Sequence, residues 1–464
     1  MTRREESTLL IIVCLGSFFH VQSMGSIQVA LPAIQREFDS SLAAIQWIGM
    51  MGAITVSSLS LCFGRASDLV GRKRFFKIGL ALYAAGAGLA ALSGSFFGLL
   101  TFRLVMTVGL AMAGPMAGAL IATAFPPERR GLALGLLGSS IAVGRTTGPA
   151  IGGLILFLWG WRAVFLANCL FGIFTCLMVL GGLKGKEERR SERFDFAGAL
   201  FLLLGYPSTL IAMSLGAKTN WESPQIVFWF GVAAAASAAF VWRELHTATP
   251  LLRLSYFKDS SLSAAVLSLA MTSAVHLPLY VFGPLYMRNI LQFSPFVVGM
   301  VMATLPLTTA LSSILSGRLA DRINARWVAT SGSFFLVLGI FLYANAGAES
   351  SHLRVIAALA LTGAGIGLFT PANEKLAFFT VGSGNYGVLS AILASVASAS
   401  GALGTSLAVA LAENSRSKRE IADPAGFAHD QQSAFWFLLP LAALGLLITL
   451  AGRRKPATEM TSRD

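Results

Sequence analysis

Four ionisable side chains lie inside stretches that are otherwise apolar, and they decide which chemistry the chain could perform. They are His20, Arg103, Arg145 and His276. Ionisable groups in the hydrocarbon region of a membrane are costly and are candidate functional residues by default. A histidine can carry a proton because its unperturbed pKa is about 6.5, and an arginine there must be met by carbonyls, water or an anion. These residue types point to proton coupling or anion contact, with helix packing as the alternative for each.

The composition indicates which elements would hold these residues. Of the 464 residues, 55% are hydrophobic and 12% are charged, and the mean hydropathy is +0.70. Soluble domains are about 45–50% apolar and about 25% charged. Apolar runs of about 20 residues, the length that crosses a bilayer as a helix, recur along the chain. We predict an all-α polytopic membrane protein with fourteen spans, at about 9–31, 44–63, 76–94, 97–122, 131–157, 163–182, 196–216, 224–242, 261–286, 296–316, 327–346, 352–372, 384–411 and 434–452.

The net charge of +13 could indicate a nucleic-acid partner, but the positions of the basic residues indicate membrane orientation instead. If the N-terminus is cytoplasmic, most Lys and Arg residues fall in cytoplasmic segments, as the positive-inside rule requires. We therefore expect both termini in the cytoplasm and no nucleic acid as partner. The four cysteines lie in or beside spans without metal-ligand spacing, so we expect neither a metal nor a cofactor.

Two short stretches recur in the second half of the chain. "GRASDLVGRKR", which contains Asp68, returns as "GRLADRINARW", which contains Asp321, 253 residues later. "PPERRGLALG" and "GSGNYGVLSA" place Gly131 and Gly387 256 residues apart. The chain therefore reads as a duplication.

The duplication predicts how the spans are grouped. We expect an N-terminal six-helix bundle (1–183), a central loop with two extra spans (184–260), a C-terminal six-helix bundle (261–452) and a cytoplasmic tail (453–464). Two homologous halves that rock about a site near the membrane midplane are what alternating-access transporters use. No GxxxxGK[ST] loop is present, so we expect no ATP-driven step within this chain.

The stretch "GLLGSSIAVGRTTGPAIGG" (135–153) and the "WGWRAVFLAN" that follows it carry a resemblance. The sequence resembles the major facilitator superfamily and, within it, the fourteen-span drug:proton antiporter family, over nearly the whole chain. Glycines four residues apart let a neighbouring helix approach closely, and a proline within a helix allows a bend. The residues that match the antiporter motif are Gly135, Gly144, Gly148, Pro149, Gly152 and Gly153.

The recurring cytoplasmic stretch resembles the signature loop of the same superfamily. The resemblance implies that Gly64 and Gly71 permit a tight turn and that Asp68, with Arg72 and Lys73, latches the cytoplasmic side. A carboxylate beside a helix N-terminus gains about 0.3–1 kcal/mol, which is weak enough to break in each transport cycle. The alternative is an ordinary positive-inside loop. The expected gating residues are Gly64, Arg65, Asp68, Gly71, Arg72, Lys73, Gly317, Arg318 and Asp321.

The sequence departs from the family pattern at two places. Arg103 and Gly109 match the expected motif on the fourth span, but Met106 and Thr107 replace its glutamine and glycine. On the first span, Ser23 occupies a place where relatives usually carry an aspartate. A proton would therefore need another carrier, for which we consider His20, Asp68, Arg103, His276 and Glu374.

A helical wheel places Arg145 on the same side of its span as Gly148, Pro149 and Gly152, so we expect it to face protein. A structural role, contact with an anion and an electrostatic part in proton coupling all remain open for it. We expect the substrate cavity to include His20, Gln28, Arg103, Arg145, His276 and Asn373. A basic lining favours neutral or anionic substrates over quaternary cations.

These observations predict a function. We expect a monomeric, proton-coupled exporter of small amphipathic drugs or metabolites in a bacterial cytoplasmic membrane, whose partners are the substrate, protons and the lipid bilayer. An importer or facilitator of organic anions or nutrients on the same fold is the alternative. A membrane enzyme would need paired acids, a metal cluster or a nucleophile with its base at one depth, and the spans contain none.

Overall fold

The structure is a computed structural model that describes residues 3–40, 42–182, 194–216, 223–247, 249–347, 350–381, 385–416 and 424–451. Most of the central charged loop and the tail after residue 451 lie outside these residues. Across the described ranges, the secondary structure is helical and contains no strand. The expected all-α class is confirmed.

The helices follow one another with short connections. In chain order they are α1 (Arg3–Glu37), α2 (Leu42–Val70), α3 (Arg72–Ala91), α4 (Phe96–Ala124), α5 (Pro127–Gly182), α6 (Phe196–Gly216), α7 (Pro224–His246), the 3-10 helix η1 (Leu254–Lys258), α8 (Ser260–His276), α9 (Leu279–Asn289), α10 (Pro295–Arg322), α11 (Ala325–Ala344), α12 (His352–Phe379), α13 (Tyr386–Arg416) and α14 (Pro424–Ala451). Ten helical segments of the described chain are long and apolar enough to cross a membrane.

The helices differ from the expected spans in two regions. Helix α5 covers two expected spans, 131–157 and 163–182, and is divided at Gly160, whose φ of 80° is a conformation that favours glycine. Helices α8 and α9 together fill the single expected span 261–286, because Pro278 follows the end of α8 and lacks the amide hydrogen that a continuous helix would use. The count of fourteen spans stays a prediction.

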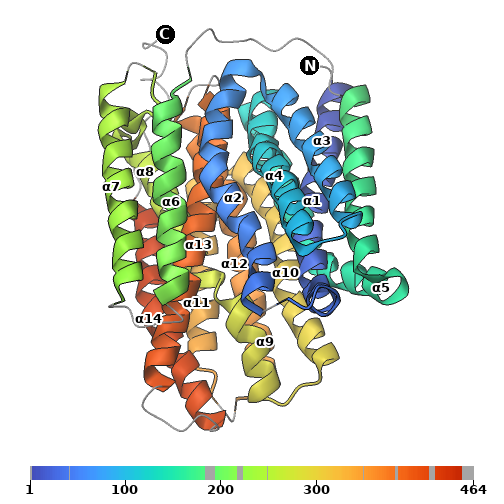
Figure 1. The fold of residues 1–464 in the computed structure, drawn as a ribbon. Helices are drawn as coiled ribbons and strands as arrows, with labels where there is room; N and C mark the ends of the chain where they lie inside the picture. Colours follow the sequence, from blue (N-terminus) through green and yellow to red (C-terminus); the bar gives the residue numbers. More distant parts are fainter. Residues whose placement is uncertain are drawn as a thin grey trace.

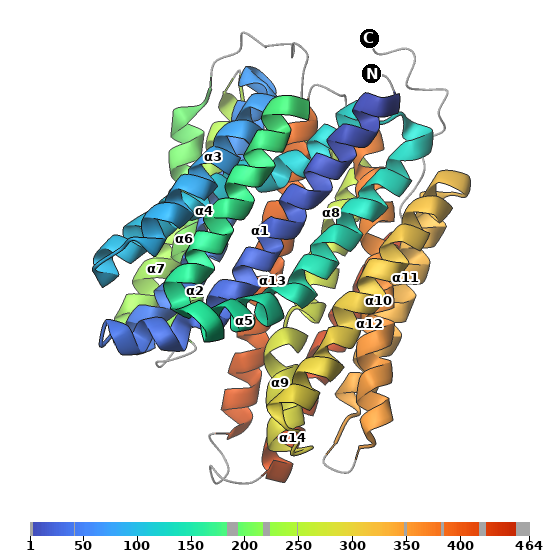
Figure 2. The same cartoon turned by 90° about the vertical axis from the view of Figure 1, so that its right-hand side faces the viewer.

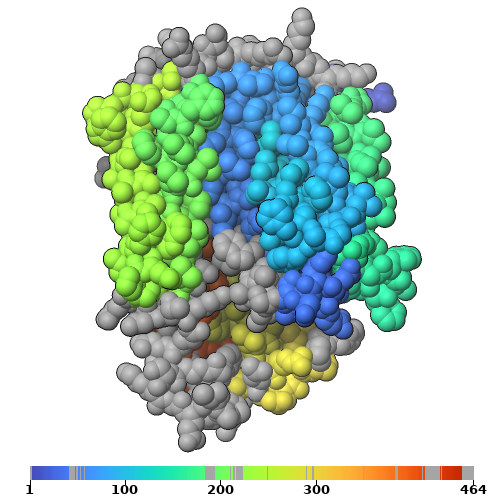
Figure 3. Space-filling model, in the orientation of Figure 1, coloured from blue at the N-terminus to red at the C-terminus, as the bar shows by residue number. Residues whose placement is uncertain are grey.

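The helices form two groups (Figure 1). Helices α1–α5, which we call the N-terminal group, pack on one another, and α8–α14, the C-terminal group, do the same. The two groups meet where α5 packs on α10 and α2 packs on α13. Helices α6 and α7 pack on each other, and α6 also contacts α2 and α13. Figure 3 shows α6 and α7 in green beside α2 on one face of the molecule.

One end of the bundle is marked by an ion pair between α1 and α5. Near the start of α1, Glu6 lies 2.9 Å from Arg129 at the start of α5. We call this end of the molecule the latch end. In Figure 2, α5 and α10 come together toward this end, which lies at the top.

Small residues let α5 approach two different helices. On one face, a Cβ at Gly144, Gly148 or Gly152 would lie 2.6, 2.6 or 2.3 Å from a backbone atom of α1. On another face, a Cβ at Gly135 would lie 2.3 Å from the carbonyl oxygen of Ser313 in α10. At Gly153 only a side-chain atom of Val29 lies within 4 Å, so the space there is ordinary. The glycines of α5 therefore allow close packing on α1 within its own group and on α10 of the other group.

Candidate functional site: two helix caps between the groups

Each group of helices caps a helix of the other group with an aspartate. Asp68, near the end of α2, accepts hydrogen bonds from the backbone amides of Gly387 and Val388 at the start of α13, both at 3.0 Å. Asp321, near the end of α10, accepts hydrogen bonds from the amides of Gly131 and Leu132, the fifth and sixth residues of α5, at 2.9 and 2.8 Å.

Both aspartates lie near the N-terminal end of a helix, which carries a partial positive charge. Gly387 and Val388 are the second and third residues of α13, where the amides have no partner within the helix, whereas Gly131 and Leu132 are the fifth and sixth residues of α5. A carboxylate with two oxygens accepts from two amides at once. Asp68 and Asp321 are the two aspartates of the recurring sequence stretch, and Gly131 and Gly387 belong to the second recurring pair. The repeat therefore produces two reciprocal contacts, each of which closes the latch end between the groups.

A different cation accompanies each aspartate. Arg72, in the first turn of α3, donates from Nε to Asp68 at 2.8 Å and from Nη1 to the hydroxyl of Thr123 at 2.6 Å. Lys375, in α12, forms an ion pair with Asp321 and donates to the carbonyl of Ala320 at 2.9 Å. Burial raises the pKa of Asp68 above its ordinary value, and Arg72 and the two amides offset part of this rise. Burial therefore disfavours the ionised form of Asp68, which is the form that makes the cap.

Aromatic rings connect the two caps. The guanidinium carbon of Arg130, in the first turn of α5, lies 5.3 Å from the ring centre of Tyr386 and 5.9 Å from that of Phe379. The guanidinium carbon of Arg72 lies 5.6 Å from the ring centre of Tyr386. Since Tyr386 is the first residue of α13, one ring contacts cations from both capped regions.

The glycines of the recurring stretch have different roles. Gly71 has a φ of 119° and forms the turn between α2 and α3, which an L side chain would strain. Gly64 lies within α2, so the expectation of a turn there was wrong. A Cβ at Gly64 would lie 2.5 Å from Cβ of Ala391 in α13 and 2.7 Å from the carbonyl oxygen of Gly387. Gly64 permits close packing instead.

The other expected gating residues surround the caps. A Cβ at Gly317 would lie 2.4 Å from the carbonyl oxygen of Gly131, so α10 touches the backbone of α5 beside Asp321. Arg65 is buried, Lys73 is half-buried and Arg318 is exposed.

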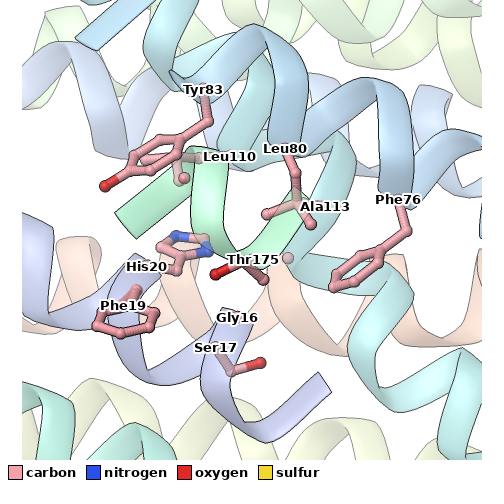
Figure 4. A pocket seen from close by; sticks show the side chains of 12 residues that line it. Gly16, Ser17, Phe19, His20, Phe76, Leu80, Tyr83, Leu110, Ala113 and Thr175 are labelled. Atoms are coloured by element: carbon pink, nitrogen blue, oxygen red, sulfur yellow. The ribbon is translucent and has the colours of Figure 1, made fainter. Parts of the chain in front are cut away.

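His20 lines a small pocket inside the N-terminal group rather than a space between the groups (Figure 4). Its ring lies beside α4, where a Cβ at Gly114 would be 3.2 Å from Cε1. The pocket has room for about one water molecule. It is lined by Gly16, Ser17, Phe19, His20, Phe76, Leu80, Tyr83, Leu110, Ala113, Gly114, Gly172 and Thr175. The structure therefore does not bring His20 together with the C-terminal group.

Arg103 lies in a buried polar region of the N-terminal group. Its side chain is 2% exposed and donates from Nη1 to the sulfur of Met106 at 3.2 Å. Nearby, the hydroxyl of Tyr83 donates to Asn168 at 3.2 Å, and Asn168 donates to the carbonyl of Val164 at 2.8 Å. Ser23, which stands where relatives carry an aspartate, is fully buried. This region packs helices together and does not open toward the other group in this conformation.

Of the three candidates in the C-terminal group, Asn373 and His276 make hydrogen bonds to the protein and Glu374 makes none to the described residues. Asn373 was expected to line a cavity, but it is buried and donates to the carbonyl of Ala265 in α8 at 2.9 Å, so it ties α12 to α8. The next residue, Glu374, is half-buried, and its carboxylate makes no hydrogen bond or ion pair to the described residues. His276 ends α8, and its Nδ1 lies 2.7 Å from the carbonyl oxygen of Thr272.

Arg145 contacts the opposite group. Its Nη1 lies 3.4 Å from the hydroxyl of Tyr280 in α9, and its guanidinium carbon lies 5.4 Å from the centre of the Tyr280 ring. The helical wheel predicted that Arg145 faces protein, yet its side chain is exposed apart from this contact. Gln28 is also exposed, on α1.

Four residues at these sites were not anticipated from the sequence: Arg130, Tyr280, Lys375 and Tyr386. Their contacts join helices far apart in the chain, which periodicity does not reveal. Pro278, two residues before Tyr280, was the available signal for a helix break there. Within the described residues, no group of three or more His, Cys, Asp or Glu side chains could hold a metal ion.

The long apolar helices and the contacts between two groups define a multi-pass membrane protein of two helix bundles. The chain belongs to the Major Facilitator Superfamily, whose family model matches residues 13–283 and 262–463.

Several relatives are similar over most of the chain. The multidrug resistance protein Stp of Mycobacterium tuberculosis is 28% identical over 409 residues, which cover 88% of this chain and 75% of that protein. The riboflavin transporter RibZ of Clostridioides difficile is 25% identical over 459 residues, which cover 97% of this chain and 98% of that protein.

Solved structures share the fold. The human organic anion transporter MFSD10 (TETRAN) aligns with a TM-score of 0.68 at 17% identity, over 97% of this chain and 100% of that one. A bacterial homologue of the iron transporter ferroportin in an outward-facing state aligns with a TM-score of 0.67 at 14% identity, over 96% and 98% of the two chains.

Proposed function

We propose that the protein is a proton-driven exporter of small amphipathic drugs or metabolites, which works by alternating access. The reciprocal caps of Asp68 and Asp321 are the observation that carries this proposal. Each cap joins the end of a helix in one group to the start of a helix in the other, so the latch end can open only when both aspartates release their amides. We assign the latch end to the cytoplasm, together with both termini of the chain, in a bacterial cytoplasmic membrane.

The size of the cap energies suits a gate that opens repeatedly. A carboxylate at a helix N-terminus contributes about 0.3–1 kcal/mol when exposed and up to about 2 kcal/mol when partly buried. Two such contacts hold the closed state, and substrate or proton binding can overcome them. The raised pKa of Asp68 supports this role, because burial opposes the charged form that makes the cap.

Glu374 is the proton carrier that the contacts favour. Asp68 is occupied by two amides and Arg72. Arg103 and His20 lie inside the N-terminal group, and His276 is bonded to its own helix. The Glu374 carboxylate has no hydrogen-bond or ion-pair partner in the described part of the chain, although Lys375 beside it does. It can therefore take up and release a proton without breaking a structural bond.

The relatives support the substrate class. Proteins named for multidrug resistance and a riboflavin transporter are similar over most of this chain. Export of amphipathic compounds, neutral or anionic, is consistent with an exposed arginine and with the buried serine at position 23. We infer that one chain forms the complete transporter.

Uptake into inside-out membrane vesicles under an imposed pH gradient tests the proposal. We expect substrate uptake only while the vesicle interior is more acidic, and we expect Glu374→Gln to abolish this gradient-driven uptake. Glu128→Gln is the matched control, because Glu128 is an exposed acid at the start of α5, and it should retain uptake. Uptake that continues unchanged after the gradient collapses would establish a facilitator instead, and an unaffected Glu374→Gln variant would remove this residue from proton coupling.

A further inference from the structure

We propose that Arg145 and Tyr280 form a recognition site for aromatic organic anions, in which the guanidinium binds the carboxylate and the tyrosine ring packs on the substrate's flat ring. This inference rests on the proposed transport function and specifies its substrate class. The two residues come from different groups, α5 and α9, so a ligand bound to both would touch each side of the moving contact.

Arg145 lies on α5 between its contacts with α10 and with α1. Gly138, Arg145 and Gly152 share one face, because a spacing of seven residues completes about two turns of a helix. A Cβ at Gly138 would lie 3.2 Å from the hydroxyl of Ser313 in α10, and a Cβ at Gly152 would lie 2.3 Å from Cα of Ser26 in α1. Between these two contacts Arg145 is exposed, and its own contact is with Tyr280 of the C-terminal group.

The lipid-facing side of α5 is a different one. Val143 and Leu154 are 38% and 59% exposed, and both lie roughly opposite Arg145 on the helix. Tyr280, by contrast, contacts Arg145 from the C-terminal group. Arg145 is thus exposed on the side where the two groups face each other.

The described residues do not neutralise the charge of Arg145. No carboxylate among the described residues forms an ion pair with it, and its single hydrogen bond, to Tyr280, is long at 3.4 Å. A guanidinium has five N–H donors in a planar fork that matches the two oxygens of a carboxylate. An arginine at this depth needs carbonyls, water or an anion around it, and an anionic ligand can replace water at the exposed guanidinium.

Tyr280 is held in place by the break between α8 and α9. His276 ends α8, Pro278 follows, and Tyr280 is the second residue of α9. Its side chain is half-buried, which fixes the ring while one face stays in contact with the guanidinium. Aromatic rings associate in offset or edge-to-face arrangements, so a flat ligand can pack beside Tyr280 while its carboxylate binds Arg145.

Binding of four small probes to the purified full-length protein in detergent, measured by calorimetry without any gradient, tests this site. The probes are naphthalene-2-carboxylate, its neutral amide, naphthylmethylammonium and cyclohexanecarboxylate. We expect the naphthalene carboxylate to bind at least about tenfold more tightly than each of the others, because a hydrogen-bonded charge and a ring contact are both required.

Variants separate the contributions of charge and ring. Arg145→Gln should weaken carboxylate binding by at least about tenfold and leave the amide unchanged, while Arg145→Lys should retain part of the affinity. Tyr280→Leu should weaken binding of the naphthalene carboxylate and of its amide, and Tyr280→Phe should not. Arg253→Gln, at an exposed arginine outside the site, should bind like the parent protein.

Three results would overturn the site. They are no binding of the naphthalene carboxylate to the parent protein, preference for the ammonium probe, and unchanged carboxylate affinity in Arg145→Gln. None of these results concerns the pH gradient, so proton-driven export of other compounds would stand. Conversely, binding as expected together with gradient-independent uptake would retain the site and refute the exporter.

Discussion

The two helix caps have similar hydrogen-bond lengths but different electrostatic support. In each cap, one aspartate accepts hydrogen bonds from two backbone amides of a helix in the other group. The cation beside Asp68 is Arg72, four residues along the chain, whereas the cation beside Asp321 is Lys375 from α12. Duplication therefore preserved the hydrogen bonds between the groups and left each half to supply its own counter-charge.

This difference predicts that the loss of Asp321 is more costly than the loss of Asp68. Asp321→Ala leaves Lys375, which is 4% exposed, as a buried ammonium without an acid, and such a break costs about 3–5 kcal/mol. Asp68→Ala also leaves a buried cation, Arg72, but should cost less, about 1–3 kcal/mol. Arg72 would keep the hydroxyl of Thr123 and Lys375 would keep the carbonyl of Ala320, but burial opposes the charge of Asp68 and raises its pKa, so removing that charge offsets part of the loss. Thermal unfolding midpoints of the purified variants in detergent measure both.

A second substitution checks the physical reason. Adding Lys375→Met to Asp321→Ala should restore most of the decrease in the unfolding midpoint temperature, because a hydrophobic residue of similar volume removes the unpaired charge. Adding Arg72→Met to Asp68→Ala should recover little, since it also removes the bond to Thr123. Equal losses at the two aspartates, or no recovery with Lys375→Met, would show that the two caps are electrostatically equivalent.

Glycine substitutions should weaken the two caps alike. A Cβ at Gly131 would lie 2.5 Å from Oδ1 of Asp321, and a Cβ at Gly387 would lie 2.5 Å from Oδ1 of Asp68. Each Gly→Ala change should destabilise the capped state by about 1–3 kcal/mol, as overpacking does.

The opening can be measured with a cysteine introduced at Ser139, which is buried between α5 and α10, in a background without the native cysteines. In the Gly131→Ala and Gly387→Ala variants this cysteine should react faster with a maleimide than in the parent protein.

Gly181→Ala is the control for this experiment, because a Cβ there would have no atom within 4 Å. Its maleimide reaction rate should match that of the parent protein. If Gly131→Ala and Gly387→Ala also react at the parent rate, the carboxylates can shift without opening the latch end.

The smallest expected effect concerns Arg130, which links the two caps through aromatic rings. Arg130→Gln removes cation–π contacts to Tyr386 and Phe379, and because Arg130 is buried each is worth about 0.5–2 kcal/mol. A double-mutant cycle of Arg130→Gln with Tyr386→Leu, read from unfolding midpoints, measures the coupling. Additive losses would mean that the ring contact contributes nothing and that the caps act independently.

The sequence predicted the caps better than it predicted their surroundings. The repeat places Asp68 and Asp321 in equivalent positions, and helix electrostatics predicts that a carboxylate there lies beside a helix N-terminus. Which helix it caps, and that Lys375 accompanies Asp321, depend on contacts between segments more than 50 residues apart. Such pairings follow from how the two groups close, which no local pattern contains.

The α5 helix shows the same limit at finer scale. Its glycine spacing predicts close packing, but the sequence does not say that Gly144 meets α1 while Gly135 meets α10. The helical wheel correctly grouped Arg145 with Pro149, yet it could not separate a face packed on protein from a face open to a gap. Pro278 was read as part of a continuous span, so Tyr280 was overlooked.

Helix α6 makes the surroundings of the α2–α13 contact different from those of the α5–α10 contact. Helix α6 packs on both α2 and α13, so it covers that contact from outside, whereas α5 and α10 lie uncovered at the front of Figure 2. In that view no described helix lies over the seam between α5 and α10. In a bilayer, its thickness and acyl-chain order would then act more on the Asp321 side of the molecule than on the Asp68 side, which α6 covers.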